Sequence, residues 1–181
     1  MGFADRYIHA LSAPNLKDDE RHHQTEPLLA AAFAAAEVSG DLGPLLHRVK
    51  FADSLARQAF EGNAGNLAQL LRLWTAEVIK RGRARKWIKE DTTWNVDAAM
   101  SLYLQVAEAS LAHWLDSTCK TCSGTTIHQH QQCRTCKGTG SAPIEHNSKL
   151  VEERAKDMVS ELQGIVDSHA ARAAAKLRRP A

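Results

Sequence analysis

The feature that most constrains this chain is the arrangement of its four cysteines. They form two Cys-x-x-Cys pairs separated by the ten residues 123–132: Cys119, Cys122, Cys133 and Cys136. Two such pairs on one short loop have the spacing of a tetrahedral zinc site, in which each pair supplies two thiolates at about 2.3 Å from the metal. We therefore expect the four cysteines to bind one structural Zn²⁺ ion.

Two other states of the cysteines are open at this point: a pair of disulfides or a redox pair, and four free thiols. An intracellular compartment disfavours disulfides. Gly124 and Gly138 each follow the second cysteine of a pair by two residues. A chain that leaves a tight turn there requires φ > 0, which glycine adopts without a Cβ clash. His128 and His130 lie in the connecting loop and are expected to be solvated, because four thiolates already complete the metal's coordination.

Such a closed site has no position for a water molecule or a substrate, so the metal is expected to stabilise the fold rather than to catalyse. The rest of the chain contains no Gly-rich phosphate loop with its lysine, no His-Glu-x-x-His and no Gly-x-Ser-x-Gly. The sequence therefore predicts that the protein is not an enzyme.

The remainder of the chain is expected to be helical. Frequent Ala, Leu and Arg and sparse β-branched residues favour helices over sheets. Apolar residues recur at helical spacing in five segments: residues 27–38, 44–60, 66–79, 96–115 and 149 onward. We predict an all-α bundle with a helical domain at residues 1–117, a small zinc-knuckle hairpin at 118–143 (here the cysteine module), and a C-terminal helix within 144–181 that packs on the helical domain. No internal repeat is found.

Two of these helices have apolar stripes that predict their buried faces. The fourth helix is expected to bury Val96, Met100, Tyr103, Ala107, Leu111 and Trp114. The last helix has an alternating seam of Val151, Ala155, Met158, Leu162, Ile165 and His169. This seam packs either on the other helices or on a second copy of the chain, as a homodimer.

A basic segment follows the third apolar stripe. Six of the ten residues 80–89 are cationic: Lys80, Arg81, Arg83, Arg85, Lys86 and Lys89. The whole chain has a net charge of only +2, so any nucleic-acid surface must be local. This density of positive charge is stabilised by phosphates and predicts DNA contacts, which Arg134 and Lys137 of the cysteine module would extend. The alternative is a solvated helix end. Trp87 either anchors the segment to the core or stacks on a base.

The form Cys-x-x-Cys-x-Gly-x-Gly at residues 133–140 resembles the cysteine-rich repeat of DnaJ-type co-chaperones. In the first pair, Thr126 stands where that repeat has its second glycine. The family usually has four such repeats and two zinc sites, together with a His-Pro-Asp signature that is absent from this sequence.

The layout of the whole chain resembles phage late-gene antitermination proteins of the Q type, which are small, helical and have a similar zinc element between helices. The matching residues are Cys136-Lys-Gly138-Thr-Gly140, and Leu73-Trp74 before a basic segment. The resemblance implies that the four cysteines bind zinc. It also implies that the protein binds DNA near a late promoter and associates with RNA polymerase in a bacterial cytoplasm. With no secretory signal at the N-terminus and no apolar run of about 18 residues, no membrane association is expected.

Overall fold

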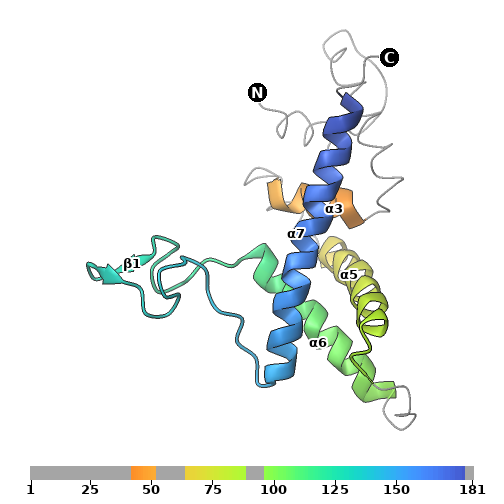
Figure 1. The fold of residues 1–181 in the computed structure, drawn as a ribbon, viewed down its shortest axis with the longest axis horizontal. Coiled ribbons are helices and arrows are strands. Elements are labelled where there is room, and N and C mark those ends of the chain that lie inside the picture. Colours follow the sequence, from red (N-terminus) through yellow and green to blue (C-terminus); the bar gives the residue numbers. More distant parts are fainter. Residues whose placement is uncertain (1–41, 52–63, 89–95, 178–181) are drawn as a thin grey trace. The chain divides into compact units, whose positions relative to one another are not determined.

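The computed structural model describes residues 42–51, 64–88 and 96–177. The helix expected at residues 27–38, the cation Lys89 and the last four residues lie outside this part of the chain. The described elements are α3 (Leu42–Phe51), α5 (Ala64–Ala84), α6 (Val96–Leu115), β1 (Ile127–His128), β2 (Gln131–Gln132) and α7 (Lys149–Leu177). Figure 1 shows the small hairpin between α6 and α7. The predicted fold class, helical with a four-cysteine hairpin before the last long helix, is confirmed.

The chain divides into two compact units, residues 1–73 with 162–181 and residues 74–161. The second unit contains the end of α5, α6, the cysteine module and the start of α7. This division does not coincide with the predicted boundaries at residues 118 and 143. Among the described helices, none has a stretch long and apolar enough to cross a bilayer.

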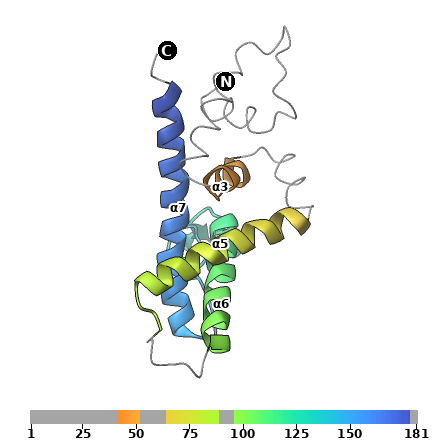
Figure 2. The ribbon, with the colours of Figure 1, turned by 90° about the vertical axis from the view of Figure 1, so that its right-hand side faces the viewer.

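Within the unit 74–161, the end of α5 crosses α6 and the start of α7 (Figure 2). Trp74 of α5 is fully buried, and its Nε1 donates a hydrogen bond of 2.9 Å to Ser110 Oγ of α6. The Ser110 hydroxyl in turn donates to the Val106 carbonyl at 2.6 Å. The indole N–H and the hydroxyl are therefore both satisfied inside the core, which fixes the register of α5 against α6.

The end of α5 is capped by its own backbone. The N–H of Trp87 donates to the Gly82 carbonyl and that of Lys86 to the Arg83 carbonyl, both at 3.0 Å. Lys86 has φ 53°, so this is a Schellman cap with lysine where glycine is usual. Trp87 stacks on Tyr103 of α6, with ring centroids 6.1 Å apart. The Arg154 guanidinium of α7 lies 5.2 Å from the Trp87 ring centroid. Trp87 thus anchors the basic segment to the helices, the first of its two predicted roles.

The stripe predicted for α6 is correct except at its start. Tyr103, Ala107, Leu111 and Trp114 are buried, together with Val106 and Ser110. Val96 and Met100 are 66% and 43% exposed, so their predicted burial is wrong. Both lie on the same side of the helix as Trp114, but no described element covers the first turns of α6. Periodicity predicts which face of a helix is apolar; it does not predict how far the packing partner extends along it.

The seam predicted for α7 is also largely correct. The buried residues are Val151, Ala155, Met158, Leu162, Val166, His169 and Ala173. They recur at an interval of eleven residues (Val151 to Leu162, Ala155 to Val166), and the predicted Ile165 is only partly buried. An eleven-residue interval matches the pitch of a nearly straight helix better than a heptad does. Because this face is already buried within one chain, a homodimer through α7 would have to use another face.

The unit formed by residues 1–73 and 162–181 contains a buried histidine pair. His47 of α3 and His169 of α7 are 3% and 0% exposed, and their rings meet edge to face at 6.0 Å. Burial lowers the pKa of His47 to about 4, and burial together with the charges of His47 and Arg172 lowers the pKa of His169 to about 4. The unfolded chain therefore binds more protons than the folded chain between about pH 6.5 and 4.

We accordingly expect the free energy of unfolding to fall as the pH falls through this window, by on the order of 2 kcal/mol for each histidine. Urea unfolding at about pH 7 and pH 4.5 measures this effect. His169→Gln cannot gain the proton and should have a shallower pH dependence than the parent protein. Metal loss in acid affects both proteins equally. The difference in pH dependence between the two proteins therefore gives the contribution of His169. Equal pH dependence in the two proteins would contradict this account.

Candidate metal centre

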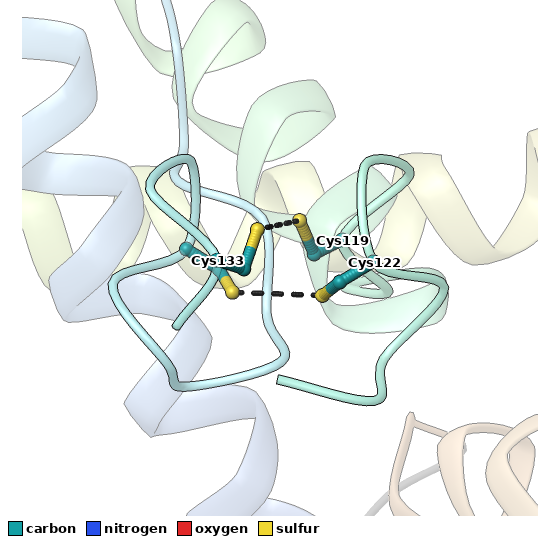
Figure 3. Close-up of side chains that lie close together, drawn as sticks. Cys119, Cys122 and Cys133 are labelled. Carbon is teal, nitrogen blue, oxygen red and sulfur yellow. Dashed lines mark hydrogen bonds between the residues drawn. The ribbon is translucent and has the colours of Figure 1, made fainter. Parts of the chain in front are cut away.

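The four cysteine side chains converge on one point. Their sulfur atoms all lie within 4.8 Å of one another, and all four residues are buried. Figure 3 shows the two cross-pair contacts, with Sγ atoms 3.9 Å apart for Cys119 and Cys133 and 3.7 Å apart for Cys122 and Cys136. A tetrahedron with metal–sulfur bonds of about 2.3 Å has edges of about 3.8 Å. The four thiols therefore fit one tetrahedral metal ion, and all four cysteines are free rather than joined in disulfides.

The backbone of each Cys-x-x-Cys turn adopts the conformation expected from its glycine. Gly124 and Gly138 have φ 80° and 79°, which confirms that prediction. The residues just before them, Ser123 and Lys137, also have positive φ, at 49° and 51°. This reversal turns the chain sharply after the second cysteine of each pair. It leaves the cysteine sulfurs on the inside of both turns and the side chains of Ser123 and Lys137 exposed.

The two halves of the module are an internal repeat with an offset of fourteen residues. Thr125 and Thr139 make the same bonds: each N–H donates to the carbonyl of the preceding cysteine, Cys122 at 2.9 Å and Cys136 at 3.0 Å. Each threonine hydroxyl donates to that same carbonyl, at 2.6 and 2.7 Å. The prediction that the chain has no internal repeat is therefore wrong. The signal is in the sequence, since Cys-x-Thr-Cys-x-Gly-Thr occurs at residues 119 and 133.

Each half closes on the other. The Cys133 N–H donates to the Thr126 carbonyl and the Cys119 N–H donates to the Gly140 carbonyl, both at 2.9 Å. On the exposed side, the hydroxyls of Thr121 and Thr135 are 3.0 Å apart, so these equivalent residues meet each other. The module is thus held by reciprocal pairs of bonds, and each half supplies two of the four clustered cysteines.

The hydrogen-bonding environment of the four thiols is uneven. Burial opposes ionisation of Cys136, but hydrogen bonds from the Gly140 N–H, the Cys133 and Cys122 thiols and the Gly138 N–H together lower its pKa to about 6. The Gly140 nitrogen is 3.3 Å from Cys136 Sγ. Burial raises the pKa of Cys122 to about 11, and backbone hydrogen bonding lowers that of Cys119. A bound metal ion would hold all four as thiolates, and binding would release protons.

The histidines of the connecting loop are not part of the cluster. His128 lies in β1 and His130 in the turn before β2, and both are exposed. Within the described residues, the four cysteines are the only group of histidine, cysteine, aspartate or glutamate side chains placed to share a metal ion. Both histidines are solvated, as the sequence predicted.

The repeat identifies one glycine that cannot be replaced. Gly140 has φ 77°, and a Cβ at this position would lie 2.7 Å from the Gly124 carbonyl oxygen. Its counterpart in the first half, Thr126, already has a side chain at φ 68°. We expect Gly140→Ala to reduce metal affinity ten- to a hundred-fold, roughly 1–3 kcal/mol of strain. Thr126→Ala is the matched control and should change affinity little in the same chelator competition. Equal losses in the two variants would contradict this assignment.

The predicted nucleic-acid residues fall into three groups. In the first, Arg81 pairs with Glu77 at 2.9 Å and with Glu161, and Arg85 pairs with Asp157 and Glu161. These bonds tie α5 to α7. Lys80 makes only an exposed contact of 3.5 Å with Glu77.

The second group, Arg83 and Lys86, is exposed and has no carboxylate partner among the described residues. The third group, Arg134 and Lys137, is exposed in the cysteine module. Lys120 of the cysteine module is also exposed, and the repeat makes it the counterpart of Arg134, a role that was not predicted from the sequence. Residues 117–144 contain these three cations and no acidic residue.

Comparison with protein families, with curated proteins and with solved structures finds no match for this chain.

Proposed function

We propose that the metal held by the four cysteines is Zn²⁺. A closed set of four thiolates at tetrahedral spacing suits zinc or iron, and zinc is the usual ion where the site is structural. The module has only two strands of two residues each, so its reciprocal hydrogen bonds depend on the cysteines being held together. In this role the ion supplies folding free energy to the module.

We further propose that the protein is a DNA-binding transcription regulator of the late-gene antitermination type. The observation that carries this proposal is the exposed, acid-free surface of the cysteine module, with Lys120, Arg134 and Lys137. Zn²⁺ with four thiolates has two net negative charges, and three cations leave the module with one positive charge. A small surface with spaced cations and no carboxylates suits the phosphate backbone of DNA.

The end of α5 offers two further exposed cations in the same unit. Arg83 and Lys86 project without carboxylate partners in the described chain, whereas Arg81 and Arg85 are used to hold α7. We therefore assign phosphate contacts to Arg83 and Lys86, and a structural role to the two paired arginines. Lys86 has φ 53°, a backbone conformation that glycine adopts with less strain. Strain of this kind is common at functional positions.

The test is fluorescence anisotropy with duplex DNA across a salt series. Five phosphate contacts predict a slope of log affinity against log salt of about −4 to −5. Replacing Arg83 and Lys86 together by alanine should make the slope shallower by about 2. Arg81→Ala removes a paired guanidinium and is the matched control, with an unchanged slope expected. No binding at low salt would refute the proposal.

Lys86→Gly separates stability from binding. Glycine at this Schellman position removes the cost of a left-handed lysine, so the free energy of unfolding should rise by about 1 kcal/mol. The same variant loses one phosphate contact, so its salt slope should become shallower by about 1. Thermal unfolding and anisotropy on one preparation measure both effects. If the variant is more stable but its salt slope is unchanged, Lys86 does not contact a phosphate.

A second candidate is a protein-interaction module that does not bind DNA. It is favoured by the exposed apolar side chains on α6, where Val96, Met100 and Leu104 are 66%, 43% and 43% exposed and lie one turn apart. RNA polymerase is the partner that the Q-type proposal implies. Retention of polymerase by the protein, together with no DNA binding at low salt, would support this second candidate instead.

A further inference from the structure

The hairpin of the cysteine module ends in an unusual turn. β1 and β2 pair antiparallel, with Ile127 opposite Gln132 and His128 opposite Gln131. Two residues, Gln129 and His130, connect them with φ 51° and 61°. Positive φ at both positions is the pattern of a type I′ turn, in which Asn-Gly is strongly preferred. Glutamine and histidine in this conformation cost energy that Asn-Gly would avoid, so the fold alone does not account for them.

The two faces of this hairpin have different uses. The Gln132 side chain donates to the Lys137 carbonyl at 2.9 Å and would meet a Cβ placed on Gly138. The face of the hairpin that carries Gln132 therefore packs on the rest of the cysteine module. The residues at the end of the hairpin are His128, Gln129, His130 and Gln131. All four are exposed, and within the described chain their side chains make no hydrogen bond to another protein group. Each can both donate and accept.

We propose that the hairpin end, residues 128–131, reads base edges in the major groove of duplex DNA. This inference rests on the proposed DNA-binding function. The backbone bond from Cys133 to Thr126 closes the hairpin at its base, three residues from the turn. At about 3.3 Å per residue, the turn extends about 10 Å beyond this backbone bond. The major groove is about 8.5 Å deep and about 12 Å wide, and it admits a two-stranded ribbon.

The chemistry of the four side chains suits this role. A glutamine amide can bond adenine N6 and N7 in a bidentate manner, and a neutral imidazole can donate to an acceptor on a base edge. The hairpin end contains no Lys, Arg, Asp or Glu, so it adds specificity rather than backbone affinity. Lys120, Arg134 and Lys137 lie in the same module and would supply the phosphate contacts that position it.

The experiment first selects a preferred sequence for the zinc-loaded full chain from a random duplex library. Anisotropy then compares the selected duplex with a shuffled one for the parent protein and for the double variant Gln129→Asn with His130→Gly. This variant has the preferred turn residues, so it should bind metal at least as well as the parent. We expect its preference for the selected duplex to fall about ten- to a hundred-fold, while its affinity for the shuffled duplex stays unchanged.

Lys120→Gln provides the complementary control, because a lost phosphate contact should weaken binding to both duplexes equally. If the hairpin variant keeps the full preference of the parent, the hairpin does not read bases, although DNA binding itself stands. If the parent binds DNA without any preference, the inference is likewise overturned and the proposed function survives. If the parent binds no duplex at all, both fail together.

Discussion

Replacing Cys133 by serine is expected to abolish tight metal binding and to unfold the cysteine module. Cys133 is fully buried and supplies one of four thiolates. Its N–H also closes the hairpin on Thr126. Binding free energies of structural zinc sites reach about 10–16 kcal/mol in small peptides, and this energy is folding energy where no other core exists. Competition with a zinc chelator, followed by amide exchange in residues 118–143, measures both losses.

His130→Ala is the matched control, because this exposed side chain lies in the same loop outside the sulfur cluster. It should bind one metal ion with the affinity of the parent. The amides of α6 should remain protected in the serine variant, since the Trp74–Ser110 core does not contain the metal. A serine variant that still holds one metal ion tightly would contradict the four-thiolate site.

Trp74→Ala is expected to cost about 3–5 kcal/mol, enough to unfold much of the unit 74–161. The indole is fully buried, and its removal leaves a large cavity between α5 and α6. The Ser110 hydroxyl keeps its own acceptor, the Val106 carbonyl, so most of the loss comes from the cavity rather than from an unpaired polar group. Urea unfolding followed by far-ultraviolet circular dichroism gives the free energy.

Ser110→Ala separates the two contributions. It leaves the indole N–H without its acceptor at almost no change in volume, and should cost about 1–3 kcal/mol. A Trp74→Ala variant with a loss no larger than that of Ser110→Ala would mean that the indole ring does not fill the core between these helices.

The sequence predicted most of the described fold because the determining signals are local. The helix expected at residues 96–115 is α6 with the same bounds. The residue type and spacing of the cysteines likewise predicted the four-cysteine cluster. In each case the signal lies within a few turns of the chain.

The missed features depend on contacts that a linear pattern does not contain. Arg81 and Arg85 form ion pairs with Glu161, which is far from them in sequence. Two of the cations predicted to contact DNA therefore hold α5 against α7 instead. Val96 has the right periodicity but no covering element in the described chain. The fourteen-residue repeat is different, because its matching residues at 119–125 and 133–139 are visible in the sequence itself.

The most direct test of the account is X-ray absorption at the metal edge, on protein purified without added metal, together with the metal content per chain. The account predicts one zinc ion per chain with four sulfur neighbours at about 2.3 Å and no nitrogen or oxygen neighbour. A nitrogen neighbour, fewer than four sulfurs, or cysteines joined in disulfides would contradict the closed four-thiolate site on which the proposed DNA surface is built.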